Sequence, residues 1–266
     1  DSLTVPYDID TSYDSASRVA TLTYPDAGGS RFSIKNVYNA AGYLTEVRKN
    51  DATNLLYWQG QVMNADFNWT QELLGNGLTT TRSYNAQNGR IGSIKTGVGV
   101  NGTGIQNMSF TFDGVGNLKT RNDTAVNVNE TYTYDTLNRL KTENMSGATT
   151  LAKSYTYDAI GNLKTKAGVT LNYPASGSGS VRPHALASVT GTLGGVANPT
   201  FVYDANGNMT SGYSGTETVA YTSFNMPTSI TRSGSNIQFS YDSDHNRIKE
   251  IAASGTYIFV NPGNTP

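Results

Sequence analysis

The chain has 266 residues with 19 Lys and Arg against 20 Asp and Glu, which gives a formal net charge of -1. This balance excludes the basic surface that nucleic acid or an anionic membrane would require, so we expect neither partner. The absence of cysteine excludes disulfides, thiolate catalysis and cysteine-based zinc sites.

The sequence offers no membrane span, because no stretch approaches the roughly 18 consecutive apolar residues that a spanning helix needs. The first residue is Asp1, with neither an initiator Met nor a signal-like apolar stretch. We therefore expect the chain to be a piece of a longer protein.

A short phrase recurs along the chain, in which an aromatic residue is followed by Asp or Asn and, a few residues later, by an aliphatic residue. The aromatic pairs, in chain order, are Tyr13-Asp14, Tyr38-Asn39, Tyr84-Asn85, Phe112-Asp113, Tyr134-Asp135, Tyr157-Asp158, Tyr203-Asp204 and Tyr241-Asp242. Successive pairs lie 25, 46, 28, 22, 23, 46 and 38 residues apart. We expect each step of 46 to hide one degenerate unit, and Tyr221 divides the last step. A unit repeated in this way is typical of an array of stacked units, roughly ten or eleven here.

Each unit predicts a strand, a tight turn and a returning strand. The run from Thr131 to Tyr134 alternates hydroxyl and aromatic side chains, which is the period of a β-strand. Asp135 then begins a turn, because its short carboxylate can accept hydrogen bonds from the amides that follow. Glycines that tolerate positive φ are expected in three of the turns, at Gly116, Gly161 and Gly207. The aliphatic residues that start the returning strands are expected to pack the wall, and they are Leu140, Leu163, Met209 and Ile248.

Two parts of the chain carry the weakest repeats, residues 54–78 and residues 170–200. The first contains Trp58 and Trp69, and we expect it to form two ordinary strands of a worn repeat. The composition, with 28 Gly and 17 Tyr, favours short strands and frequent turns over helices. The sequence therefore predicts an all-β hairpin array.

The repeated carboxylates could act as general acids or metal ligands, but such chemistry needs them together in one pocket. Because one Asp recurs per unit, we expect them to be spread along the sheet and to shape turns. The run from Asp242 to Asn246 is similar to the opening of a calcium loop, yet Arg247 and Ala253 stand where that loop needs Gly and Glu. His184 and His245 lack any nucleophile motif around them. We predict no catalytic, cofactor-binding or metal-binding residue, no cofactor and no enzyme activity.

The pattern Tyr-x-Tyr-Asp-x-x-Gly-Asn/Arg-Leu resembles the YD repeat of the RHS family, which includes bacterial polymorphic toxins, the cocoon-forming components of Tc toxins and the animal teneurins. The match is strongest from Phe110 to Lys166 and from Phe201 to Ile251. The resemblance implies a long β-sheet that spirals into a hollow shell, which encloses a cytotoxic C-terminal segment in the toxin members. Those members end in a self-cleaving protease core with an Asp-Pro signature. This chain has no Asp-Pro dipeptide, so the resemblance implies neither the protease nor a toxin segment within it.

Two functions follow from the resemblance and the repeats. The first is a non-enzymatic scaffold of a secreted or cell-surface bacterial protein, with residues 1–266 as one continuous RHS/YD-repeat segment. Its expected partners are the remaining RHS-repeat regions, copies of itself and an enclosed toxin segment. The second is an adhesion or filament protein that assembles end to end or binds glycans, because an open sheet has unpaired edges.

Overall fold

The computed structural model describes residues 8–26 and 28–259, and almost all of its regular structure is β-strand. The only helical element in these residues is one 3-10 turn, η1 (Tyr213–Gly215). The predicted all-β fold is therefore confirmed. Throughout the part of the chain described here, no helix has the length and apolar character needed to cross a membrane.

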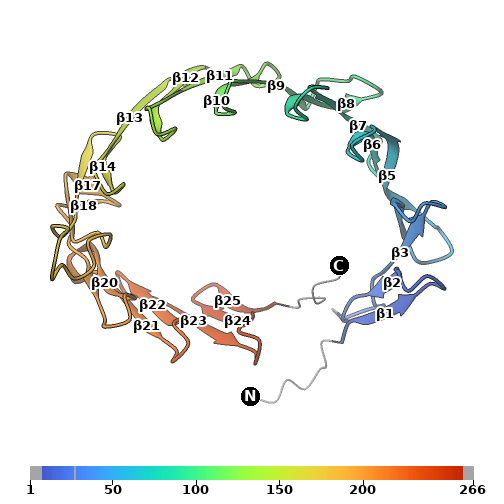
Figure 1. The fold of residues 1–266 in the computed structure, drawn as a ribbon. Helices are drawn as coiled ribbons and strands as arrows, with labels where there is room; N and C mark the ends of the chain where they lie inside the picture. The colour runs from blue at the N-terminus through green and yellow to red at the C-terminus, as the bar shows by residue number, and fades with distance from the viewer. Residues whose placement is uncertain (1–7, 27, 260–266) are drawn as a thin grey trace. The chain divides into compact units, whose positions relative to one another are not determined.

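The chain divides into two compact units, and unit 1 contains residues 8–134 and 144–151. Its sheet places eleven strands side by side in the order of the sequence, as Figure 1 shows along the blue-to-green ribbon. The strands are β1 (Asp10–Tyr13), β2 (Val19–Thr23), β3 (Ser33–Tyr38), β4 (Leu44–Lys49), β5 (Leu56–Met63), β6 (Trp69–Leu74), β7 (Leu78–Tyr84), β8 (Ile91–Val98), β9 (Gln106–Phe112), β10 (Leu118–Asp123) and β11 (Val128–Tyr134).

Unit 2 contains residues 135–143 and 152–259. It has one run of sequential strands from β13 to β16, a small pair β17 and β18, and a second run from β19 to β25. The strands are β13 (Leu151–Tyr157), β14 (Leu163–Lys166), β15 (Val169–Asn172), β16 (Ser188–Thr190), β17 (Thr192–Leu193), β18 (Val196–Ala197), β19 (Val202–Tyr203), β20 (Met209–Gly212), β21 (Glu217–Tyr221), β22 (Pro227–Arg232), β23 (Ser235–Tyr241), β24 (Arg247–Ala252) and β25 (Gly255–Ile258). The remaining strand, β12 (Leu140–Gly147), contains residues of both units, and the first residue of β13, Leu151, belongs to unit 1.

Neighbouring strands pair antiparallel, and polar side chains bridge them on one face. Hydroxyl groups meet across the strands at Thr111 and Thr120, 2.7 Å apart, and at Thr156 and Thr165, also 2.7 Å apart. Such cross-strand pairs are the sheet's local source of stability. They follow from the alternation of Thr or Ser with aromatic residues along each strand.

The hydrophobic core is thin, because each unit is built of hairpins laid side by side. Among the described residues, the buried core consists of Leu22, Val189 and Val219, together with Pro199. Buried polar groups are paired: Glu130, only 4% exposed, binds Arg121 on the neighbouring strand, with Arg121 Nη2 donating to its Oε1 at 2.9 Å. Stability must therefore come from strand pairing and from contacts between successive repeats.

Candidate functional site

The repeated turn is best seen at Asp135. Its Oδ1 accepts hydrogen bonds from the backbone N–H groups of Leu137 (2.9 Å) and Arg139 (3.0 Å), and its Oδ2 accepts one from Arg139 Nε at 2.8 Å. The backbone closes the hairpin with Asp135 N donating to Arg139 O at 2.9 Å and Asn138 N donating to Asp135 O at 3.0 Å. Asn138 has a φ of 60°, so the turn is a type I turn followed by a bulge.

The repeat carboxylates all serve turns of this kind. The backbone N–H and side chain of Arg139 lower the pKa of Asp135. At Asp158 burial opposes ionisation, but hydrogen bonds from the backbone and side chain of Asn162 outweigh it and lower the pKa. The pKa is lowered in the same way by hydrogen bonds within the turn at Asp14, Asp113, Asp204 and Asp242.

These carboxylates are not brought together. Each lies in its own turn, and the described residues contain no group of three or more His, Asp or Glu side chains placed to hold a metal ion. At the calcium-like run, Asp242 Oδ1 accepts from the backbone of Asp244 (2.9 Å) and Asn246 (2.8 Å), which is the ordinary turn. Among the described residues, each repeat carboxylate is thus bonded to its own turn and not paired with another for acid–base chemistry.

In the regular turns the fourth residue takes a left-handed conformation, which explains the recurrent glycine; in the longer turn at Asn85 the fifth residue, Gly89, takes it. Gly116, Gly161 and Gly207 have φ values of 105°, 92° and 90°. A residue with a Cβ is strained at such an angle, whereas glycine is not. Where glycine is absent the position still has positive φ, at Ser17, Phe67, Asn138, Asn225 and His245.

Six of the repeat tyrosines donate a hydrogen bond to the preceding repeat. The hydroxyl of Tyr157 donates to the backbone carbonyl of Leu140 at 3.0 Å, and that of Tyr134 donates to Leu118 O at 2.9 Å. The acceptor in each case is the aliphatic residue that follows the preceding turn. Four more tyrosines make the equivalent bond, Tyr38 to Val19, Tyr203 to Leu186, Tyr221 to Met209 and Tyr241 to Pro227.

Some predicted repeat residues lie differently. Tyr13 is 63% exposed, and Ile248 is 38% exposed because Arg247 occupies the place opposite Tyr241. Phe112 has no hydroxyl and lies under the guanidinium of Arg90, 5.7 Å from its carbon to the ring centroid. The asparagines that replace Asp keep the turn: Asn39 Oδ1 accepts from Ala41 and Tyr43, and Asn85 Oδ1 from Gln87 and Asn88.

Both 46-residue steps contain a further hairpin. Between Tyr38 and Tyr84, strands β5 and β6 are joined by a turn in which Asn64 Oδ1 accepts from the backbone of Asp66 and Asn68, both within 3.0 Å. Between Tyr157 and Tyr203, β15 and β16 pair, but the long segment 173–187 replaces the tight turn. In the last step, Thr222 begins a turn that closes with Thr222 N donating to Met226 O at 2.8 Å.

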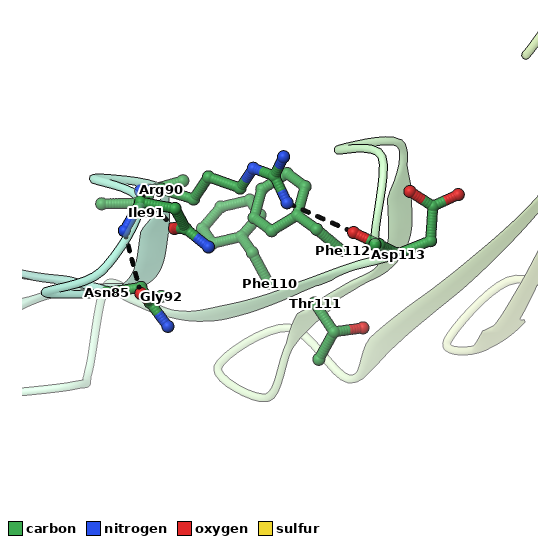
Figure 2. Close-up of a pocket in the computed structure, with 10 residues that line it drawn as sticks. Asn85, Arg90, Ile91, Gly92, Phe110, Thr111, Phe112 and Asp113 are labelled. Carbon is green, nitrogen blue, oxygen red and sulfur yellow. Dashed lines mark hydrogen bonds between the residues drawn. The ribbon is translucent and has the colours of Figure 1, made fainter.

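One pocket lies beside the turn at Asn85, in unit 1. It has a volume of about 420 Å³ and is lined by two turns and the strand β9. Figure 2 shows the guanidinium of Arg90 extending over Phe112 towards the backbone of Asp113. Its Nη1 donates to Asp113 O at 3.2 Å.

No protein-family model matches the chain, and no curated protein matches it significantly. Solved structures do resemble it. The chain superposes over 92% of its length on a chain of the crystal structure of TcdB2-TccC3-TEV, with a TM-score of 0.72 and 16% identity. It superposes as well on TcdB2-TccC3-Cdc42, over 92% of its length with a TM-score of 0.71 and 16% identity.

This chain has the fold of those structures. It spans only 13% of the length of each matched chain. The predicted resemblance to the RHS-repeat shell of Tc toxins is confirmed at the level of the fold.

Sequence reasoning missed the arginines that follow several turns. Arg18 and Arg139 each pair with the Asp of their own turn, both at 2.7 Å, and each lies 4.4 Å above the tyrosine of the next repeat. The signal was present, because Arg stands four residues after Asp in both turns. The stacking of each arginine on the next repeat depends on the register between hairpins, which cannot be read from the sequence.

A second missed group surrounds Asn162, which is only 6% exposed. Its Nδ2 donates to Asp158 Oδ2 at 2.9 Å and to the carbonyl of Pro183 at 2.8 Å, and its Oδ1 lies 2.7 Å from Nδ1 of His184. His184 thus binds a turn 22 residues earlier. No local pattern around His184 indicates this contact.

Proposed function

We propose that this chain is a non-enzymatic RHS/YD-repeat scaffold, part of the wall of a hollow β-shell that encloses a toxin or effector segment. The observation that carries the proposal is the bond that six repeat tyrosines make to the preceding repeat, as from Tyr157 to Leu140 O. Such bonds fix each hairpin to its neighbour, and this is expected to make the sheet stiff. The likeness of fold to TcdB2-TccC3 complexes supports the same function.

The use of the carboxylates supports a role without catalysis. In a general acid or base, a carboxyl group must face the substrate with oxygens free to exchange a proton. In this chain both oxygens of Asp158 accept hydrogen bonds from their own turn, as do those of Asp135. The repeated residues are thus occupied in building the sheet.

The proposal also concerns the larger protein. We take residues 1–266 as one continuous repeat segment of a longer, secreted or cell-surface protein whose other repeats complete the shell. The matched chains are about seven times as long as this chain, since 92% of it covers 13% of them. The partners are then the remaining repeat regions and the enclosed segment.

A second candidate is a filament or adhesive protein, and the edge strand β25 favours it. Within the described residues β25 pairs only with β24, so its other side presents unpaired N–H and C=O groups. Such an edge can pair with another copy of the chain or with an adhesion partner.

Particle images of the full-length protein separate the two functions. A closed hollow particle, with a segment inside that resists protease until the shell is denatured, supports enclosure. Continuous fibres that lengthen with protein concentration support the filament instead. Solid or irregular particles, with every segment cut at the same rate, would contradict the shell.

A further inference from the structure

The pocket beside Asn85 contains an arginine whose usual partner is missing. In the turns at Asp14 and Asp135, the arginine that follows is neutralised by the carboxylate of its own turn, at 2.7 Å. Arg90 also ends its turn and lies over the aromatic ring of the next repeat, but its turn is one residue longer and begins with Asn85, which has no carboxylate. The turn therefore supplies no carboxylate to neutralise the charge of Arg90.

No other carboxylate replaces the missing one. Within the described residues, Arg90 forms no ion pair within 4.0 Å, and its one side-chain hydrogen bond goes to the carbonyl of Asp113. The carboxylate of Asp113 is already engaged, with Oδ1 accepting from three backbone N–H groups and Oδ2 from Asn117 Nδ2 at 2.9 Å. In Figure 2 that carboxylate points away from the guanidinium.

The amide side chains around Arg90 are also arranged as donors. Asn85 Oδ1 accepts from the backbone of the turn, at 2.9 and 3.2 Å, and Asn88 Oδ1 accepts from Arg90 N at 3.1 Å. Their amino groups make no hydrogen bond within the described residues, so they can donate outward. The guanidinium of Arg90 offers donors only, which suits an anionic ligand rich in acceptors.

Apolar surface completes the pocket. Phe110 and Phe112 lie on the same face of β9, and Ile91 and Gly92 of the neighbouring strand β8 also line the pocket. Gly116 makes room for the guanidinium, since a Cβ at that position would lie 2.6 Å from Arg90 Nη2. The volume of about 420 Å³ falls within the range of small-molecule sites.

We propose that this pocket binds a carboxylate carried on an aromatic group, with the carboxylate on Arg90 and the ring against Phe110. The bidentate fork of arginine fits a carboxylate, and aromatic rings pack on each other at offset or edge-on angles. Two sources carry this chemistry, a free aromatic acid and the C-terminus of a peptide that ends in Phe. This proposal goes beyond the scaffold function, because it assigns a ligand-binding site to the turn at Asn85.

The test is a titration of the full chain with N-acetyl-L-phenylalanine, followed by backbone amide chemical shifts in NMR. Saturable shifts around Arg90 and Phe110 are expected. The neutral N-acetyl-L-phenylalaninamide should bind about tenfold more weakly or not at all, because it lacks the charge. A peptide with a free C-terminal Phe identifies the source: tighter binding than the free acid assigns a chain terminus, and equal or weaker binding assigns a small acid.

Two variants probe the residues. Arg90→Gln should weaken binding of N-acetyl-L-phenylalanine about tenfold. Because this variant could also loosen the repeat, Asn85→Asp provides a second: it keeps Arg90 and restores the carboxylate of the regular turn, and it should weaken binding to a similar extent. Lys119→Gln removes an exposed positive charge from β10 and is the control, with unchanged affinity expected.

Three results would overturn the site. One is binding of the amide as tight as that of the acid. Another is full affinity in both Arg90→Gln and Asn85→Asp while each keeps the melting temperature of the parent chain. The third is inorganic phosphate binding at the same residues at least as tightly, which would mean a general anion site without an aromatic requirement.

Discussion

A comparison within unit 2 shows what holds a repeat in place. The turn from Asp158 to Asn162 closes on itself, with the carboxylate taking hydrogen bonds from the backbone and from the Asn162 amide. The corresponding connection of the next repeat, segment 173–187, has no such turn. It relies on its neighbour, because Asn162 binds Pro183 O at 2.8 Å and His184 at 2.7 Å.

Segment 173–187 is nevertheless followed by the same kind of bond to the next repeat as the regular turn at Asp135. The hydroxyl of Tyr203 donates to Leu186 O at 2.9 Å, as the hydroxyl of Tyr157 donates to Leu140 O at 3.0 Å. A repeat can thus lose its turn and still keep its place in the sheet. The contacts between repeats therefore hold a repeat in the sheet more than its turn does, which explains why the chain tolerates repeats that lack the regular turn.

The largest expected effect tests this equivalence. Tyr157→Ala and Tyr203→Ala should each lower the free energy of unfolding by about 3 kcal/mol, because each loses a packed ring and the bond to the preceding repeat. Chemical denaturation measures both. Tyr157→Phe, which keeps the ring, should cost only about 1 kcal/mol. A loss of unfolding free energy below about 0.5 kcal/mol for Tyr157→Ala would show that this tyrosine does not stabilise the sheet.

A smaller effect is expected at the amide that serves both connections. Asn162→Ala removes the partner of Pro183 and His184 and should cost about 2 kcal/mol, since it leaves buried groups without partners. It should also speed proteolysis within segment 173–187. Asn246→Ala is the matched control, because Asn246 is exposed and its amide donates only to Asp242 Oδ2, at 3.1 Å. Equal rates of cleavage in the two variants would show that the neighbour does not hold the segment.

The same comparison shows what the sequence could predict. The alternation of aromatic and hydroxyl residues and the Asp at the turn were sufficient for strands, turns and antiparallel pairing, because these depend on residues close together in the chain. Even the weak repeat around Trp58 formed its expected two strands, β5 and β6.

The contacts between repeats could not be predicted in this way. His184 and Asn162 are 22 residues apart, and Arg90 meets Asp113 across 23. Both contacts join a turn to the next connection, so they depend on register and on side-chain direction across the sheet. The pocket at Arg90 lies beside a turn that begins with Asn85 in place of Asp, and therefore has no carboxylate from that turn.

The smallest expected effect concerns the regular turn alone. Hydrogen bonds from Asn162 outweigh burial and lower the pKa of Asp158 below its ordinary 3.8. Because the folded pKa lies below that of the unfolded chain, the carboxylate stabilises the fold above about pH 4 and loses this contribution as pH falls through the folded value. Asp158→Asn keeps an oxygen for the turn, as Asn39 does, but has no charge to lose.

The variant should therefore melt slightly below the parent chain at neutral pH, and the difference should shrink towards about pH 3. Melting curves followed by circular dichroism at several pH values measure it. The equivalent change at Asp204, Asp204→Asn, should behave alike, because its carboxylate accepts from Asn208 in the same manner. A difference that stays constant with pH would mean that the ionised carboxylate adds nothing, and that the turn depends on its backbone bonds and on its left-handed glycine.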